Sequence, residues 1–157
     1  NQSKSNVTSG GLGTMGYALP AAIGAAYGDP SRTTVAIIGD GGFQMTLQEL
    51  GTIMQFKPNV KIIILNNQFL GMVRQWQELF FDNRYASTKM INPNFVAIAE
   101  GYHIKSKKVT QREDLDAAVA EMMASKDSYF LEVMVEKENN VFPMIPTGAS
   151  VSDMRLS

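Results

Sequence analysis

Two groups of polar residues, each directly behind a short apolar run, are the part of this sequence best suited to chemistry. Asp40 lies between two glycines just after the apolar run at residues 35–38. Asn66 and Asn67 directly follow the second run, at residues 60–65. Runs of this length and β-branched composition predict strands of a parallel sheet, whose sites lie at the carboxyl ends of the strands. Mg²⁺ prefers carboxylate and amide oxygens and keeps positions for phosphate oxygens and water. The pattern therefore predicts an anchor for magnesium and a diphosphate.

A glycine motif near the amino end supports a competing interpretation. Gly11, Gly13 and Gly16 match the spacing of a dinucleotide-binding loop, and Asp40 could then be the ribose-binding carboxylate. However, the strand before this motif would be short, and an aspartate between two glycines suits a phosphate better than a ribose. This interpretation also leaves the paired asparagines unexplained. A nicotinamide or flavin site is therefore the weaker alternative.

Alternating strand and helix patterns place these residues in an α/β domain with a mostly parallel sheet and helices on both faces. The domain is expected to span residues 1–137, and residues 138–157, which contain prolines and a glycine, are expected to form an irregular tail. Thr46 and Glu49 have the spacing of a capping box. Strands are predicted at 35–38, 60–65, 102–109 and 129–135, and helices at 17–27, 46–56, from 71, at 92–99 and at 111–125.

The composition excludes several function classes. The chain has 157 residues and a net charge of −1, which allows one domain with a core and provides no basic field for nucleic acid or an anionic membrane. No apolar run approaches the roughly 20 residues of a membrane span. The absence of cysteine excludes disulfides and thiolate zinc sites, and a single histidine leaves little room for a Ser-His-Asp triad. A cytoplasmic location is expected.

Several stretches also carry a family resemblance, at residues 8–17, 39–46, 66–67, 71–77 and 143–148. Together they resemble the C-terminal thiamine-diphosphate-binding domain of acetolactate synthase (acetohydroxyacid synthase) large subunits. The Gly-Asp-Gly and Asn-Asn pair is typical of thiamine-diphosphate enzymes as a class. The Gly-Met-Val-x-Gln-Trp-Gln stretch narrows the resemblance to acetolactate synthases, and the similarity covers nearly the whole chain.

The resemblance implies a role for individual residues. Asp40 and Asn67 would bind Mg²⁺ through side-chain oxygens, and Phe69 would bind it through its backbone carbonyl. Trp76, with Met72 and Val73, would line the substrate channel and favour 2-ketobutyrate as second substrate. The implied cofactor-binding residues are Gly13, Met15 (as an apolar wedge that bends the cofactor), Gly39, Asp40, Gly41, Gly42, Met45, Asn67, Gly71 and Met72.

The implied activity is decarboxylation of pyruvate and transfer of the two-carbon unit to pyruvate or 2-ketobutyrate, in branched-chain amino-acid biosynthesis. In such enzymes the catalytic glutamate belongs to an N-terminal pyrimidine-binding domain and FAD binds to a middle domain, and neither domain is expected in this chain. No catalytic residue is therefore assigned here, and the isolated chain is expected to be inactive or nearly so. The missing domains, a homodimeric partner and a regulatory small subunit are the expected partners.

Two further alternatives stay open at this point. The same cofactor site would serve a pyruvate oxidase, a glyoxylate carboligase or a 2-ketoacid decarboxylase. A domain that only assembles with other domains and binds no cofactor is less favoured, since a disused site would not need both Asp40 and Asn67.

Overall fold

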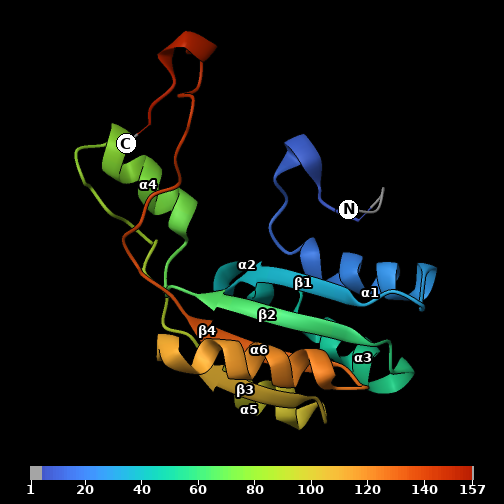
Figure 1. The fold of residues 1–157 in the computed structure, drawn as a ribbon. Coiled ribbons are helices and arrows are strands. Elements are labelled where there is room, and N and C mark those ends of the chain that lie inside the picture. The colour runs from blue at the N-terminus through green and yellow to red at the C-terminus, as the bar shows by residue number, and fades with distance from the viewer. Residues whose placement is uncertain (1–4, 157) are drawn as a thin grey trace.

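The computed structural model describes residues 5–156, in which four strands form one sheet. The strands are, in chain order, β1 (Thr34–Gly39), β2 (Val60–Asn66), β3 (Lys105–Val109) and β4 (Tyr129–Met134). Their order across the sheet is β1–β2–β4–β3, and every neighbouring pair is parallel (Figure 1). The predicted α/β class with a parallel sheet is confirmed.

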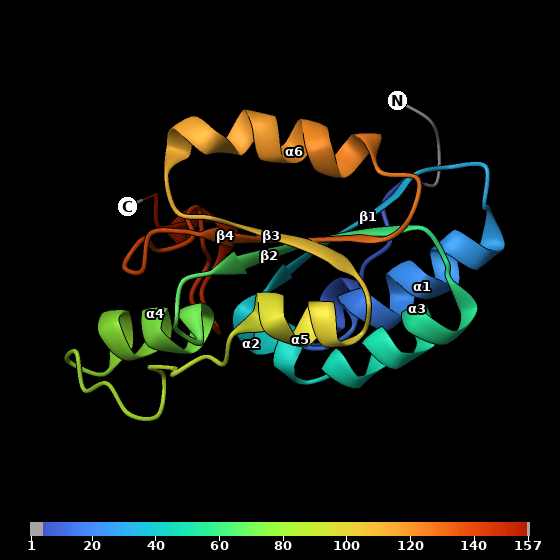
Figure 2. The same cartoon turned by 90° about the horizontal axis from the view of Figure 1, so that it is seen from below.

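The helices are divided unequally between the two faces of the sheet (Figure 2). One face carries α1 (Ala18–Gly28), α2 (Asp40–Gln44), α3 (Leu50–Phe56) and α5 (Phe95–Gly101). The other face carries α6 (Leu115–Ala124), and α4 (Gly71–Phe80) lies beyond the carboxyl ends of the strands. The connection from β3 to β4 crosses the sheet in the opposite direction to that from β1 to β2. Right-handed crossovers therefore put α6 and α3 on opposite faces.

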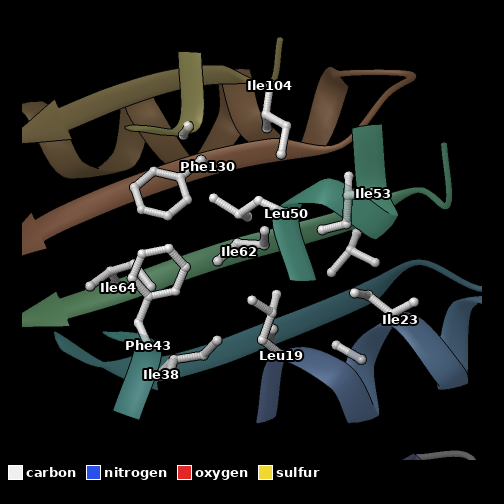
Figure 3. Close-up of a cluster of buried hydrophobic side chains, with 14 of the residues drawn as sticks. Leu19, Ile23, Ile38, Phe43, Leu50, Ile53, Ile62, Ile64, Ile104 and Phe130 are labelled. Carbon is white, nitrogen blue, oxygen red and sulfur yellow. The ribbon is translucent and has the colours of Figure 1, made fainter. Parts of the chain in front are cut away.

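The larger hydrophobic core lies between the sheet and the four helices on its first face (Figure 3). Phe43 of α2 is fully buried at its centre, with its ring 5.4 Å from Phe95 and 5.3 Å from Phe130. Aromatic pairs at such separations stabilise a fold beyond the area that they bury. These contacts fix the short helix α2, which begins at Asp40, against β4 and α5.

The smaller core, under α6, leaves part of the second face uncovered. Val109, Met122 and Leu131 are buried in it, all from β3, β4 and α6. On β1, by contrast, Val35 is 41% exposed and Ile37 is 64% exposed. The apolar run at residues 35–38 suggests a buried strand, and this interpretation is wrong, because helices cover only one face of β1. An apolar strip remains accessible on this face.

The capping box predicted at Thr46 is not formed. The Thr46 hydroxyl donates to the carbonyl of Gly16 at 2.9 Å, and Glu49 accepts from the hydroxyl of Thr52. A 3-10 turn precedes α3, which begins only at Leu50. The Thr46 side chain therefore joins the glycine loop to the segment after α2 instead of capping a helix.

The helix predicted from Asn92 begins later, with Asn94 as its N-cap. The side chain of Asn94 accepts a hydrogen bond from the amide of Ala97 at 3.1 Å, and α5 starts at Phe95. Asn92 is thus left outside the helix, and its side chain is free to make the contacts described below. The strand that follows α5, β3, also begins later than predicted, at Lys105.

The described part of the C-terminal tail runs beside α4 and contains one 3-10 turn (Val151–Asp153) (Figure 1). Met144 and Arg155 form an antiparallel bridge within it. Gln75 of α4 holds the tail through both ends of its amide, which bind the carbonyl and the amide of Val141 at 3.0 and 2.8 Å. Within residues 5–156, no helix has the length and apolar character needed to cross a membrane.

A buried lysine joins β2 to the loop between α6 and β4. Lys61 is 1% exposed, and its ammonium donates to Asn59 Oδ1 and to the carbonyls of Ser125 and Asp127. Burial lowers the pKa of Lys61 below its usual range, and the charge of Asp127 opposes that shift. The ammonium therefore has three oxygen acceptors, which a charge withdrawn from water requires.

Replacing Lys61 by methionine is expected to lower the free energy of unfolding by about 2 kcal/mol, since hydrogen bonds from a charged donor are lost. Chemical denaturation of the two proteins would measure the difference. Lys126→Met, at an exposed position in the same loop, is the matched control and should change stability by less than about 0.5 kcal/mol. Equal stability of the two variants would show that the Lys61 contacts contribute nothing net.

Candidate functional site

A cavity of about 480 Å³ opens at the carboxyl ends of β1 and β2, where the glycine loop and the start of α4 meet. The parallel register brings Gly39, the last residue of β1, opposite Leu65, next to the asparagine pair. Three predicted site residues, Gly13, Met45 and Trp76, do not line this cavity. The predicted site residues that do line it are Met15, Gly39, Asp40, Gly41, Gly42, Asn67, Phe69, Gly71, Met72 and Val73.

Asp40 presents one held oxygen and one free oxygen. The residue is 1% exposed, and its Oδ2 accepts from the Gln68 amide at 3.0 Å and from Asn92 Nδ2 at 2.6 Å. In the part of the chain that the structure describes, no hydrogen bond ends on Oδ1. A carboxylate held in this way keeps one oxygen for a cation, which is the arrangement that a magnesium ligand needs.

The turn after β2 fixes Asn67 beside Asp40. Gln68 has a left-handed backbone with φ of 60°, and the amide of Phe69 donates to Asn67 Oδ1 at 3.1 Å. A carbonyl-type oxygen has a second lone pair, so Asn67 Oδ1 keeps a position for a metal ion. A Cβ atom added at Gly71 would lie 3.1 Å from Asn67 Nδ2. Glycine at this position therefore lets α4 start against the asparagine.

Two glycines shape the wall of the cavity. A Cβ atom added at Gly39 would meet nothing within 4 Å, whereas one at Gly41 would lie 2.7 Å from Leu70 Cδ2 and 3.4 Å from Met15 Cε. The backbone at Gly41 therefore fits closely against two apolar side chains that also line the cavity. The first amides of a helix have no partner within the helix, so those at the start of α2 are available to an anion such as a diphosphate.

Met15 lines the cavity, but Gly13 and Met45 do not. Gly13 has a left-handed φ of 55° in the loop before Met15. Met45 is 53% exposed and lies beside Gly16, where an added Cβ atom would be 3.0 Å from Met45 Cβ. Of these three residues, only Met15 therefore forms part of the cavity wall.

On α4, the predicted channel residues divide into two groups. Met72 and Val73, in the first turn, line the cavity and are 53% and 44% exposed. Trp76 lies one turn further on, with its ring 5.0 Å from that of Phe80. The indole therefore packs against another side chain of α4 and does not form the wall of the cavity.

A network of polar groups ties α4 to the tail. Arg74 pairs with Glu78 at 2.7 Å and also donates to the carbonyl of Glu138. The hydrogen bond from Asn140, with smaller effects of Tyr85 and Arg74, holds the pKa of Glu78 below its usual range. Glu78 is therefore a structural anion and does not belong to the cavity.

The comparisons with known proteins agree with this geometry. The family model for the C-terminal TPP-binding domain of thiamine pyrophosphate enzymes matches residues 1–133. The chain belongs to this family. The cavity at the carboxyl ends of β1 and β2 lies where the ligands of an open α/β sheet are generally bound.

Relatives of this TPP-binding domain are acetolactate synthases. It is 46% identical over 149 residues to the acetolactate synthase isozyme 2 large subunit of Escherichia coli (strain K12), which covers 94% of this chain and 27% of that protein. It is 48% identical over 145 residues to the mitochondrial acetolactate synthase of Schizosaccharomyces pombe (strain 972 / ATCC 24843), with 92% and 22% covered. The chain thus spans about a quarter of the length of these relatives.

A solved structure of a thiamine diphosphate-dependent decarboxylase has the same fold. It is the thiamine diphosphate-dependent 4-hydroxybenzoylformate decarboxylase of Rhodococcus jostii RHA1, at 30% identity and a TM-score of 0.76. The match covers 82% of this chain and 24% of that one. The fold is therefore shared with a thiamine diphosphate enzyme whose name describes a decarboxylase.

The residues present in the TPP-binding domain fit a magnesium diphosphate. The free Oδ1 of Asp40 and the second lone pair of Asn67 Oδ1 are hard oxygen donors. The open space beside Gly39 leaves room for phosphate oxygens. In residues 5–156 there is no cluster of three or more His, Cys, Asp or Glu side chains suited to a metal held by protein alone. A site of this kind therefore needs oxygens from the cofactor.

Three residues that support this site were not predicted from the sequence, two of them because no pattern reveals them. Gln68 acts through its backbone amide, which no side-chain motif reveals. Asn92 lies in an Asn-Pro-Asn stretch that resembles a helix start. Glu132 is the exception, because a carboxylate within the apolar run of β4 is itself an unusual feature.

Proposed function

We propose that this chain is the thiamine-diphosphate- and magnesium-binding domain of an acetolactate synthase catalytic subunit. Such an enzyme decarboxylates pyruvate and joins the two-carbon unit to pyruvate or 2-ketobutyrate. The observation that carries the proposal is the Asp40 carboxylate, which has one oxygen held and one free in a cavity that Asn67 and Phe69 also line. The acetolactate synthase relatives, which align with almost all of the chain, favour this activity over those of other TPP enzymes.

In this proposal, residues of the chain bind and position the reactants. Asp40, Asn67 and the backbone carbonyl of Phe69 would hold Mg²⁺, and the backbone at Gly41 would receive the diphosphate. When bound, thiamine diphosphate supplies the carbon that attacks the ketoacid and accepts the electron pair left by decarboxylation. Met72, with its neighbours on α4, would limit the access of water to the reacting atoms.

The ketoacid preference tests the choice of acetolactate synthase. Replacing Trp76 by leucine in the full-length enzyme to which this domain is proposed to belong is expected to lower the preference for 2-ketobutyrate over pyruvate by about tenfold. The reason is that the contact of one extra methylene with an apolar surface contributes about 1–3 kcal/mol to selectivity. The measurement is the ratio of the two products formed from an equimolar mixture of the ketoacids.

Tyr27→Leu is the control for that experiment, because Tyr27 is another aromatic residue, 53% exposed, that lies on α1, away from the cavity. It should leave the product ratio unchanged. An unchanged ratio in the Trp76 variant, or the absence of any carboligation product from the intact protein, would contradict the acetolactate synthase assignment. A pyruvate oxidase, glyoxylate carboligase or 2-ketoacid decarboxylase would then be favoured.

We further propose that the uncovered apolar strip of the sheet faces other parts of the same enzyme. Val35 and Ile37 of β1 and Leu65 of β2 are between 39% and 64% exposed. Apolar strips of this kind mark interaction surfaces when they are contiguous. The occupants that we propose are other domains of the polypeptide, including an FAD-binding one, or a second copy in a homodimer. A regulatory small subunit would be a further partner, in keeping with the large-subunit names of the relatives.

A further inference from the structure

A buried carboxylate lies at the start of a chain of hydrogen bonds that leads to the cavity. Glu132 of β4 is 1% exposed, and its Oε1 accepts from Lys108 Nζ at 3.0 Å and from Asn66 Nδ2 at 2.7 Å. Its Oε2 is buried without a hydrogen-bond partner among the described residues. A charge inside a sheet is costly, and a paired one is often no better for stability than an apolar residue. The presence of Glu132 at this position therefore indicates a role other than stabilising the fold.

The first link fixes the orientation of the Asn66 amide. A carboxylate oxygen only accepts, so the Nδ2 of Asn66 must face Glu132 and its Oδ1 must face the other way. That Oδ1 accepts from Asn92 Nδ2 at 2.9 Å and from the Gln68 amide at 3.2 Å. Glu132 therefore determines that an acceptor points toward Asn92.

The second link fixes Asn92 in the same way. Its Nδ2 donates both to Asn66 Oδ1 and to Asp40 Oδ2, the latter at 2.6 Å. Its own Oδ1 accepts from Gln44 Nε2 at 2.9 Å. Both ends of the amide are thus determined, and the donor end can only face Asp40.

We propose that Asn92 is a positioning residue for the metal-binding carboxylate, and that Glu132 and Asn66 hold Asn92 in its active orientation. By occupying Asp40 Oδ2, Asn92 stops the carboxylate from turning and leaves Oδ1 as the oxygen directed to the metal. The inference rests on the proposed function, because it takes Asp40 as a magnesium ligand. Groups that orient a metal ligand typically change metal affinity by 10- to 100-fold when they are removed.

The test is the affinity of the intact protein for Mn²⁺, a spectroscopic substitute for Mg²⁺, measured by electron paramagnetic resonance in the presence of saturating thiamine diphosphate. Asn92→Leu keeps the volume and removes the donor, so Mn²⁺ should bind 10- to 100-fold more weakly. Asn94→Ala is the control, since it removes the N-cap of α5 two residues away and lowers stability without touching the site. It should bind Mn²⁺ within twofold of the unchanged protein.

A second pair of variants tests Glu132, at the other end of the series of hydrogen bonds. This test does not depend on the folding of the Asn92 variant. Glu132→Gln keeps an acceptor for Asn66, so Mn²⁺ affinity should stay within twofold of that of the unchanged protein. Glu132→Leu suits its apolar surroundings but frees the Asn66 amide, and it should weaken Mn²⁺ binding about three- to tenfold.

The outcomes separate this inference from the proposed function. If the unchanged protein binds Mn²⁺ and both Asn92→Leu and Glu132→Leu bind it equally well, the positioning role is wrong and the proposed function stands. If Glu132→Gln weakens binding as much as Glu132→Leu, charge and not orientation is responsible, and the role given to Glu132 is wrong. If the unchanged protein binds no Mn²⁺ with thiamine diphosphate, the proposed function fails and this inference fails with it.

Discussion

Replacing Asp40 by alanine is expected to weaken magnesium-dependent binding of thiamine diphosphate by at least about 100-fold, which corresponds to about 2.7 kcal/mol. Asp40 is the only acidic residue among the described residues that line the cavity. Its loss removes the one protein charge that can oppose the charge of Mg²⁺, and Asn67 then remains as a neutral ligand. Calorimetric titration with thiamine diphosphate, with and without Mg²⁺, would measure the effect.

The control for this prediction is Asp29→Ala. Asp29 lies in the turn before β1, at the opposite end of the sheet, where its carboxylate binds only Ser31 among the described residues. Its replacement should leave cofactor binding unchanged. Because Asp40→Ala also removes the acceptor of two hydrogen bonds, the isosteric Asp40→Asn should be measured beside it. Magnesium-dependent binding of normal strength in both Asp40 variants would refute the proposed anchor.

The location of this site was predictable from the sequence because it depends on short-range signals. A β-rich run ends in Gly-Asp-Gly, a second ends in Asn-Asn, and parallel pairing brings Gly39 opposite Leu65 without any detail of packing. The exposure of Val35 and Ile37 was not predictable in the same way. It depends on which part of the sheet α6 covers, and that follows from the strand order β1–β2–β4–β3.

The support of the site was the part that local patterns could not reveal. Asn92 is 52 residues from Asp40 in the chain, and Glu132 is 66 residues from Asn66. Only the folded sheet brings these pairs together, so no spacing rule signals them. The Thr46 capping box failed for a related reason. A long-range acceptor, the carbonyl of Gly16, competes for the hydroxyl that a local rule assigns to the helix.

On its own, the 157-residue chain is expected to turn over pyruvate at least about 1,000-fold more slowly than the full-length Escherichia coli isozyme 2 large subunit, even with saturating thiamine diphosphate and Mg²⁺. Proton transfer by a positioned side chain typically contributes 10²- to 10⁴-fold to a rate. Among the described residues that line the cavity, Asp40 is the only one with an acidic or basic side chain, and as the proposed magnesium ligand it would not serve in proton transfer. The acid–base group must then come from outside this chain.

Pyruvate consumption by the two proteins at equal concentrations of active sites would measure this difference. Calorimetry on the same preparation must show that the chain binds the cofactor, so that a low rate reflects missing chemistry and not an empty site. Turnover within about tenfold of the full-length relative would require a proton-transfer group in this chain. Since the described cavity wall provides none besides Asp40, such a result would place the reacting atoms away from the cavity and would contradict the proposed site itself.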